Sequence, residues 1–300
     1  MYDLIVVGSG PAGLTAAIYA RRAEKSVLVI EKETFGGEIT HSPKVENYPG
    51  FNELSGNELA EKLLEQTMAL GAEIEMDTIT AVEGQGPFTL RGENADYEAK
   101  TLVIASGSKH RRLGVPGEEE LTGNGVSYCA VCDGPFYKGR TVAIVGGGNS
   151  ALQQAVMMSE YCEKVTIVQN LDFLTGEKKL QDILASRSNV EVILGVTVDH
   201  LEGEQELSAV VLNQTATGEK LTIRPDGLFV AIGQAPENEP FRSVCDLNEY
   251  GYIVSNESCT TKTPGVYAAG DCRTKAIRQI VTATGDGAVA ALAACRYLEQ

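Results

Sequence analysis

Two cysteines separated by two residues stand beside an aspartate, in the stretch Tyr128-Cys-Ala-Val-Cys-Asp-Gly134. A Cys-x-x-Cys pair can close a small disulfide ring, and one of its thiols commonly has a lowered pKa. A carboxylate beside such a pair can move protons as a thiolate becomes a thiol. We therefore predict a redox dithiol formed by Cys129 and Cys132, with Asp133 as its acid or base.

Two other interpretations of this cysteine pair are a zinc site and an inert pair of buried thiols. Zinc needs four Cys or His ligands, usually in two short clusters. The histidines, His41, His110 and His200, are scattered, and the other five of the seven cysteines are isolated. We predict no metal site. The odd cysteine count does not fit a secreted disulfide framework and indicates a reducing cytosol, where the isolated cysteines are expected to be small buried hydrophobic residues.

The same glycine-rich motif occurs twice in the chain. Residues 3–13 read Asp-Leu-Ile-Val-Val-Gly-Ser-Gly-Pro-Ala-Gly, and residues 141–151 read Thr-Val-Ala-Ile-Val-Gly-Gly-Gly-Asn-Ser-Ala. Each copy predicts a buried strand, a glycine turn and a helix, and a second strand follows at 26–30 or 164–168. A further apolar strand closes each unit, at 101–107 and 227–233. Two such βαβ units predict two doubly wound parallel sheets.

Each glycine turn is suited to a dinucleotide. The first glycine permits a tight turn, the second lets the backbone approach a pyrophosphate, and the third lets the helix pack close to the strand. The helix N-terminus then offers N–H groups to the phosphates. A dithiol exchanges electrons in pairs, nicotinamides deliver hydride, and flavin mediates between them. This predicts a flavin in one unit and a nicotinamide in the other.

The residue that ends the second strand differs between the two units. In this fold an acidic residue there accepts a hydrogen bond from a ribose hydroxyl, and in the first unit it is Glu31. The second unit has Gln169 at the equivalent position, followed by Asn170 and Leu171. A 2′-phosphate would require arginines here. We predict that NADH or NADPH binds, with weak selectivity between them.

The composition is that of a soluble α/β protein. Hydrophobic residues make up 43% of the 300 residues and charged residues 22%. The net charge of −16 would repel phosphate backbones, so no nucleic acid partner is expected. The longest apolar runs fall far short of the roughly 20 residues that cross a membrane, and the chain enters a strand-like run without a basic leader. We expect a cytoplasmic protein with no membrane contact.

The whole chain resembles the low-molecular-mass thioredoxin reductases. The resemblance rests on the two glycine turns and the dithiol stretch, and on four further matches: Gly36-Gly37, Val45-Glu-Asn-Tyr-Pro-Gly50, Gly270-Asp271 and Arg278-Gln279. It implies a discontinuous FAD-binding domain of residues 1–112 and 243–300. An NAD(P)H-binding domain of residues 113–242, inserted into it, carries the dithiol.

The resemblance also implies the binding residues. The FAD contacts would come from Gly8, Gly10, Ala12, Gly13, Glu31, Gly37, Asn47, Gly107, Asp271, Arg278 and Gln279. The corresponding candidates for NAD(P)H are Gly146, Gly148, Asn149, Ser150, Ala151, Gln169 and Gly233.

The resemblance assigns roles to the dithiol as well. Cys132 would lie against the flavin and accept its electrons, and Cys129 would attack the disulfide of thioredoxin or a similar small protein. Members of this family rotate their two domains, with candidate hinges here near 112–116 and 240–243, and a homodimer is expected.

Three departures from the family pattern concern the electron donor. The family's His-Arg-Arg after the second strand reads Gln169-Asn170-Leu171, a further arginine is replaced by Thr175, and a pair of glutamates reads Gln153-Gln154. The leading hypothesis is an FAD-dependent reductase that passes electrons from NAD(P)H through the dithiol to thioredoxin. In the alternative, ferredoxin or another flavoprotein replaces the nicotinamide. A third hypothesis is a non-catalytic flavin-bearing redox sensor.

Overall fold

The chain is divided into two units, and the second is inserted into the first. In a computed structural model that describes residues 1–42 and 44–300, unit 1 comprises Met1–Lys109 and Ala235–Gln300, and unit 2 comprises His110–Gln234. The chain therefore passes between the units twice, through the short strands β7 (Lys109–His110) and β16 (Gln234–Ala235). Phe241 and Val244 are buried in the core of unit 1, so the chain has already returned to that unit before residue 241.

The sheet of unit 1 has a parallel portion in the order β3-β2-β1-β6. The free edge of β6 pairs antiparallel with β5 over its first half and parallel with β17 over its last three residues. The strands are β1 (Tyr2–Val7), β2 (Val27–Glu31), β3 (Glu73–Met76), β4 (Ile79–Gly84), β5 (Phe88–Gly92), β6 (Asp96–Ile104) and β17 (Val266–Ala268).

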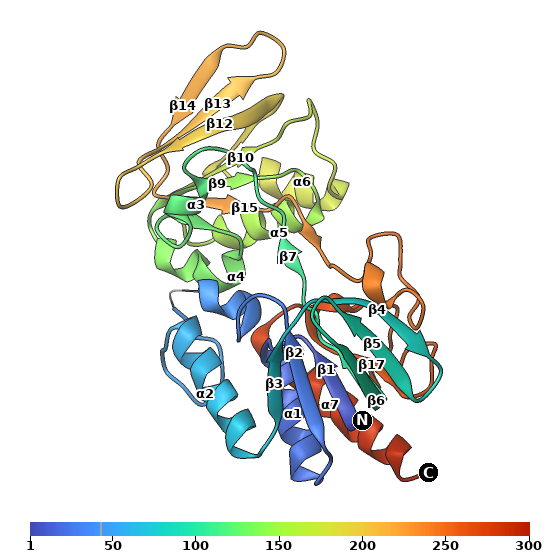
Figure 1. Cartoon of the computed structure of the whole chain (residues 1–300). Coiled ribbons are helices and arrows are strands. Elements are labelled where there is room, and N and C mark those ends of the chain that lie inside the picture. Colours follow the sequence, from blue (N-terminus) through green and yellow to red (C-terminus); the bar gives the residue numbers. More distant parts are fainter. Residues whose placement is uncertain (43) are drawn as a thin grey trace. The chain divides into compact units, whose positions relative to one another are not determined.

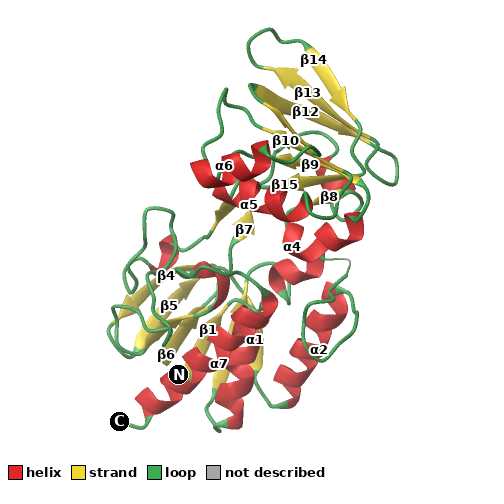
Figure 2. Cartoon of the chain, turned by 180° about the vertical axis from the view of Figure 1, so that it is seen from behind, coloured by secondary structure: helices red, strands yellow, loops and turns green. Residues whose placement is uncertain are grey.

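Helices α1 and α7 lie side by side on one face of this sheet (Figures 1 and 2). The helices of unit 1 are α1 (Pro11–Arg22), α2 (Gly56–Ala69) and α7 (Ile280–Leu298), with 3₁₀ turns η1 (Gly37–His41), η3 (Glu239–Phe241) and η4 (Gly270–Cys272). Helix α2 begins with a capping box between Ser55 and Glu58, which satisfies two backbone donors that a helix start leaves unpaired.

Alternate residues of β1 face two separate cores. Leu4 and Val6 pack with the alanine-rich faces of α1 and α7, whereas Ile5 and Val7 pack with Phe88 and Phe241 on the other side. Successive side chains of a strand point to opposite faces of the sheet, so a strand covered on both faces is apolar throughout. This explains why the run Leu4–Val7 shows no polar alternation.

Unit 2 repeats the same arrangement. Its parallel sheet has the order β11-β10-β9-β15-β8, so β9, β10 and β11 correspond to β1, β2 and β3. An antiparallel sheet, β12-β13-β14, follows between β11 and β15. The strands are β8 (Val126–Ser127), β9 (Thr141–Val145), β10 (Lys164–Val168), β11 (Val190–Ile193), β12 (Val196–Glu202), β13 (Ala209–Gln214), β14 (Lys220–Ile223) and β15 (Gly227–Val230). The helices are α3 (Glu118–Leu121), α4 (Ala130–Asp133), α5 (Asn149–Met158) and α6 (Lys178–Ala185), with 3₁₀ turn η2 (Gly134–Tyr137).

These topologies confirm the predicted fold class, an α/β protein with two Rossmann-like units, the second inserted into the first. Both predicted βαβ repeats are present, as β1-α1-β2 and β9-α5-β10, and the predicted closing strands are β6 and β15. Within the described part of the chain, none of the helices is both long and apolar enough to cross a membrane.

Two glycines of α7 provide a matched test of how closely this helix packs on α1. A Cβ at Gly287 would lie 2.2 Å from the carbonyl oxygen of Ala12, whereas a Cβ at Gly285 would meet nothing within 4 Å. We expect Gly287→Ala to lower the free energy of unfolding by about 2 kcal/mol or more, because backbone atoms must move apart. Gly285→Ala should leave it unchanged or raise it by about 0.5–1 kcal/mol. Chemical unfolding measures both, and a Gly287→Ala variant as stable as the wild type would contradict the packing described here.

Candidate active site

The dithiol stretch follows β8, an edge strand of the sheet in unit 2. Cys129 is the N-cap residue of the short helix α4, and Cys132 lies within that helix. The two cysteines form a disulfide, with their Cα atoms 5.3 Å apart. The backbone N–H of Cys132 donates a hydrogen bond to the sulfur of Cys129 at 3.2 Å. This N–H can stabilise negative charge on the Cys129 sulfur when the disulfide opens.

Asp133 is held beside the disulfide by Ser127. The Ser127 hydroxyl donates to Oδ2 of Asp133 at 2.6 Å and accepts from the backbone N–H of Cys129 at 3.1 Å. The other carboxylate oxygen, Oδ1, is buried and has no hydrogen-bond partner among the described residues. Burial raises the pKa of Asp133, although the Ser127 hydrogen bond opposes the rise. A carboxyl group with a raised pKa can hold a proton closer to neutral pH and deliver it to a thiolate.

The glycine turn of unit 1 has no room for a Cβ at its first and third glycines. Gly8 has a φ of +104°, and a Cβ there would lie 2.3 Å from the carbonyl oxygen of Ala105 in the segment that follows β6. A Cβ at Gly13 would lie 1.9 Å from the carbonyl oxygen of Gly8. Gly10 is the N-cap of α1. A Cβ at Gly37 would lie 3.5 Å from the Cα of Gly10, so these two glycines lie against each other. The turn therefore leaves the N-terminus of α1 open to an anionic group.

Glu31 lies directly beneath this turn. It is buried at 7% exposure, and its Oε2 accepts from both the backbone N–H and the hydroxyl of Ser9 at 2.7 Å. Its Oε1 accepts from the backbone N–H groups of Lys32 and Glu33, both at 2.9 Å. These four bonds match the acceptor capacity of a carboxylate. Glu31 therefore stabilises the turn, and the ribose contact that the sequence predicts would have to replace one of these bonds.

The C-terminal segment brings Asp271 to the start of α1. A Cβ at its neighbour Gly270 would lie 2.8 Å from the side chain of Ala12. Oδ1 of Asp271 is buried and lacks a hydrogen-bond partner within the described structure. Burial raises the pKa of Asp271 to about 6, against an opposing effect of Lys275 and Arg278. Such an oxygen is suited to accept from a ligand hydroxyl.

A network that sequence reasoning missed fixes the backbone next to Asp271. The carboxylate of Asp286 accepts from the backbone N–H of Gly270 at 3.0 Å, from the Arg273 guanidinium at 2.8 and 2.9 Å, and from Lys275 at 2.8 Å. The two basic side chains are at most 8% exposed. Asp286 is the seventh residue of α7, so no motif in the sequence linked it to Asp271.

The remaining predicted residues of unit 1 lie in loops. The Arg278 guanidinium lies 4.1 Å from the ring centre of Tyr252 and donates to the carbonyl oxygen of Asp271 at 3.3 Å. The side chain of Gln279 accepts from that of Asn47 at 3.2 Å. Gly107 has a φ of +69°, and a Cβ there would meet nothing within 4 Å.

The glycine turn of unit 2 reproduces that of unit 1. Gly146 has a φ of +135°, and a Cβ there would lie 2.5 Å from the carbonyl oxygen of Ala231, the counterpart of Ala105. Gly148 is the N-cap of α5, in whose first turn Asn149, Ser150 and the buried Ala151 lie. Gly233, with a φ of +103°, follows β15. The predicted residues of this unit therefore gather at the carboxyl ends of β9, β10 and β15, where ligands bind in open α/β sheets.

The family is shown by a match along nearly the whole chain. The model of the family described as "Pyridine nucleotide-disulphide oxidoreductase" matches residues 2–287. The chain belongs to this family. Among the described residues, no group of three or more His, Cys, Asp or Glu side chains could hold a metal ion.

Similar proteins span the full length of the chain. Thioredoxin reductase of Bacillus subtilis (strain 168) is 42% identical over 302 residues, which cover 100% of this chain and 96% of that protein. The 34.2 kDa protein in the rubredoxin operon of Clostridium pasteurianum is 42% identical over 99% of this chain and 97% of its own length. The crystal structure of thioredoxin reductase from Streptococcus pyogenes MGAS5005 has a TM-score of 0.96 at 40% identity, covering 100% of this chain and 98% of that chain. The resemblance to low-molecular-mass thioredoxin reductases is thus confirmed.

The raised pKa of Asp271 makes a prediction for the flavin-free protein. A carboxyl whose pKa is higher in the folded than in the unfolded state lowers stability as the pH rises through that interval, here from about 4 to about 6. We expect Asp271→Asn to be more stable than the wild type by roughly 2–3 kcal/mol at pH 7.5, with little difference near pH 4. Urea unfolding at both pH values measures this. The exposed Asp172→Asn should behave as the wild type, and an equal gain in both variants would contradict the assignment.

Proposed function

We propose that the protein is an FAD-dependent thioredoxin-disulfide reductase. It passes electrons from NAD(P)H through FAD and the Cys129/Cys132 dithiol to thioredoxin or a similar small disulfide protein. The observation that carries the proposal is the disulfide between Cys129 and Cys132 beside the half-buried carboxyl of Asp133. It is supported by the two dinucleotide-type turns of the same chain and by thioredoxin reductases about 42% identical over its full length. These relatives do not favour ferredoxin as the donor.

The residues of unit 1 fit FAD. The turn at Gly8, Gly10 and Gly13 leaves backbone N–H groups open for a pyrophosphate, and the unpartnered Oδ1 of Asp271 can accept from a ribityl hydroxyl. We assign NAD(P)H to unit 2 on its second glycine turn. Bound FAD supplies the two-electron link between nicotinamide and disulfide. The domain limits 1–112, 243–300 and 113–242 remain a prediction.

The net reaction consumes NAD(P)H, a proton and a disulfide, and yields NAD(P)⁺ and a dithiol. As the electron pair enters through Cys132, the S–S bond breaks and the two cysteine sulfurs carry the charge. Asp133 gives a proton to the Cys132 sulfur, which leaves Cys129 as the thiolate, and takes the proton back when Cys132 later attacks. The two protons of the released dithiol come from the hydrogen of NAD(P)H and from the proton consumed. The Cys129 thiolate then attacks the partner's disulfide, and one partner sulfur leaves. Cys132 resolves the mixed disulfide by attacking Cys129, which restores the disulfide and releases the reduced partner.

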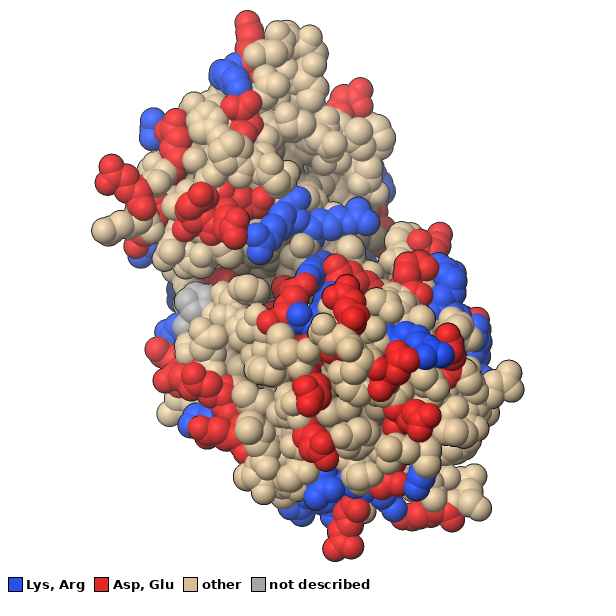
Figure 3. Space-filling view, in the orientation of Figure 1, with Lys and Arg blue, Asp and Glu red and all other residues tan. Residues whose placement is uncertain are grey.

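The partner and setting of the enzyme are further parts of the proposal. Acidic side chains are spread over the face shown in Figure 3 rather than gathered in one place, so encounter with a strongly acidic partner would be slow at low salt. We propose a homodimer, which the exposed apolar residues Val281, Val289 and Leu292 of α7 support. A cytoplasmic location is supported by the five other cysteines, which are free and buried.

The first test is an anaerobic titration of the purified yellow protein, following the visible flavin absorbance. We expect NADH or NADPH to bleach the flavin, and thioredoxin disulfide to restore the colour. Cys132→Ser should keep the flavin and its reduction by the nucleotide but reduce no disulfide, because the electron pair has no disulfide to enter. Undiminished turnover in Cys132→Ser would remove the dithiol from the mechanism. Bleaching by dithionite but by neither nucleotide would refute the nicotinamide as donor.

Asp133 and Ser127 can be tested as a pair. Asp133→Asn keeps an oxygen for the Ser127 hydroxyl but cannot give up a proton, so we expect disulfide reduction to slow about 100-fold with flavin reduction unchanged. Ser127→Ala removes the hydrogen bond that lowers the pKa of Asp133, so the alkaline limb of the pH–rate profile should move to higher pH. A profile that moves to lower pH, or not at all, would mean that Asp133 does not supply the proton.

A further inference from the structure

The loop after β10, residues 169–177, is fastened to the glycine turn of unit 2. The backbone N–H groups of Thr175 and Gly176 both donate to the carbonyl oxygen of Gly147, at 2.9 and 2.8 Å. At the end of the loop, the backbone N–H and the side chain of Glu177 bond the side chain of Asn149, at 2.7 and 3.1 Å. The loop is therefore fixed in place at the edge where the ribose end of a dinucleotide binds in this fold.

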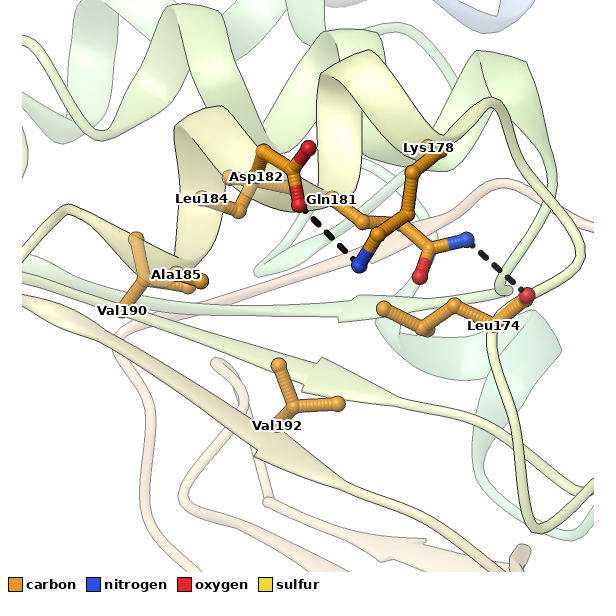
Figure 4. Close-up of a pocket in the computed structure, with 8 residues that line it drawn as sticks. All are labelled: Leu174, Lys178, Gln181, Asp182, Leu184, Ala185, Val190 and Val192. Carbon is orange, nitrogen blue, oxygen red and sulfur yellow. Dashed lines mark hydrogen bonds and ion pairs between the residues drawn. The ribbon is translucent and has the colours of Figure 1, made fainter.

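Helix α6 also holds the C-terminal part of the loop. The side-chain amide of Gln181 donates to the carbonyl oxygens of Leu174 and Gly176, at 3.2 and 2.7 Å. Figure 4 shows Gln181 directed toward Leu174.

At the start of the loop, the backbone N–H of Gln169 donates to the carbonyl oxygen of Ile193 at 3.0 Å, and the carbonyl oxygen of Leu171 accepts from the backbone N–H of Gly195 at 2.8 Å. Because both ends of the loop are held in this way, the side chains of residues 170–172 are presented by a scaffold that is already formed.

Gln169, at the start of the loop, is packed against the turn. It is 6% exposed, and a Cβ at Gly147 would lie only 2.4 Å from its Nε2. Its Oε1 accepts from the backbone N–H of Asn170 at 3.2 Å, and its Nε2 approaches the carbonyl oxygen of Phe173 at 3.4 Å. This amide carries no charge, and its hydrogen bonds go to the loop itself.

All charged side chains of the loop are acidic. Residues 169–177 include Asp172 and Glu177, both exposed, and contain no lysine or arginine. The nearest following lysine, Lys178, forms an ion pair with Asp182 at 3.0 Å, and in Figure 4 the two side chains point toward each other on α6. Lys164 lies at the opposite end of β10 and pairs with Glu191. The next lysine, Lys179, lies on α6 outside the loop, so the loop itself would present carboxylates and no cation to a 2′-phosphate.

We propose that unit 2 selects NADH over NADPH, with Asp172 and the uncharged Gln169–Leu171 segment as the specificity-determining residues. This inference rests on the proposed function, since it names the donor used at that same site. It goes beyond the weak selectivity that the sequence predicts, because the structure shows that the loop is held in place and that Lys178, the first lysine after it, is paired with Asp182. The hydroxyls of an unphosphorylated ribose carry no charge, so the same carboxylates do not repel them.

The selectivity is tested on the holoenzyme with probes that lack the nicotinamide. Calorimetry with ADP-ribose and 2′-phospho-ADP-ribose reads only the adenosine end of the site. We expect ADP-ribose to bind at least tenfold more tightly, and NADH to reduce the flavin at least tenfold faster than NADPH at equal, subsaturating concentration. Equal or tighter binding of the phosphorylated probe would overturn the inference.

Two variants locate the selectivity in the loop. Asp172→Asn should raise the affinity for 2′-phospho-ADP-ribose several-fold and leave that for ADP-ribose unchanged, because one repelling charge is lost. Asn170→Arg should raise it at least tenfold by supplying a cation. The matched control is Glu219→Gln, which removes one exposed acid from the turn before β14 and should leave the ratio of the two affinities unchanged. Equal effects of Asp172→Asn and Glu219→Gln would assign the selectivity to net charge and overturn the role of the loop.

The outcomes separate this inference from the proposed function. If NADPH reduces the flavin as fast as NADH while disulfide reduction proceeds, only the selectivity is wrong. If neither nucleotide reduces the flavin and neither probe binds, although dithionite bleaches the protein, both the selectivity and the nicotinamide donor are wrong.

Discussion

The close approach of each glycine turn to a neighbouring backbone carbonyl is the constraint on which both units depend. A Cβ at Gly8 or Gly146 would lie within 2.5 Å of the carbonyl oxygen of Ala105 or Ala231. Both glycines also have a positive φ, which residues with a Cβ adopt at a cost. Only with these side chains absent can the helix start beside the ends of the central strands. The open N–H groups at that start are what a dinucleotide phosphate requires.

The buried and half-buried carboxylates of the protein fall into two kinds, according to whether all of their oxygens have hydrogen-bond partners. The oxygens of Glu31 and Asp286 are occupied by backbone and side-chain donors, so these carboxylates mainly hold the neighbouring backbone in place. Asp133 and Asp271 each retain a buried oxygen without a partner in the described structure, and burial raises the pKa of both. Leaving such an oxygen unpaired costs stability. An unpaired oxygen on a carboxyl with a raised pKa is expected where that group must exchange a proton or bind a ligand.

The two glycine turns share a backbone but differ in charge at the end of the second strand. Glu31 places a carboxylate under the first turn, and Gln169 places a neutral amide under the second. The amide packs against Gly147 of the second turn, but its hydrogen bonds go to Asn170 and Phe173 of the following loop rather than to the turn. The chain has therefore kept the dinucleotide architecture of unit 2 while changing the electrostatics of its ribose end.

Local pattern was enough to identify the dithiol and both βαβ repeats, whereas the insertion of one unit into the other was implied by the family resemblance. The dithiol and the repeats are periodic or contiguous in sequence: apolar runs of four or five residues, glycines at fixed spacing, and Cys-x-x-Cys. The sequence also indicated the missing arginines after β10, since residue type alone decides charge.

Only the tertiary structure decided which partners the polar side chains find. It showed that Ser127 donates a hydrogen bond to Asp133 and that Asp286 accepts one from the backbone beside Asp271. It also showed that Gln169 packs against Gly147. Each of these contacts depends on the packing of strands and helices rather than on a motif, so no spacing rule predicts it. Burial, which sets the pKa of Asp133 and Asp271, is likewise a property of the packed chain, because it depends on atoms contributed by segments distant in sequence.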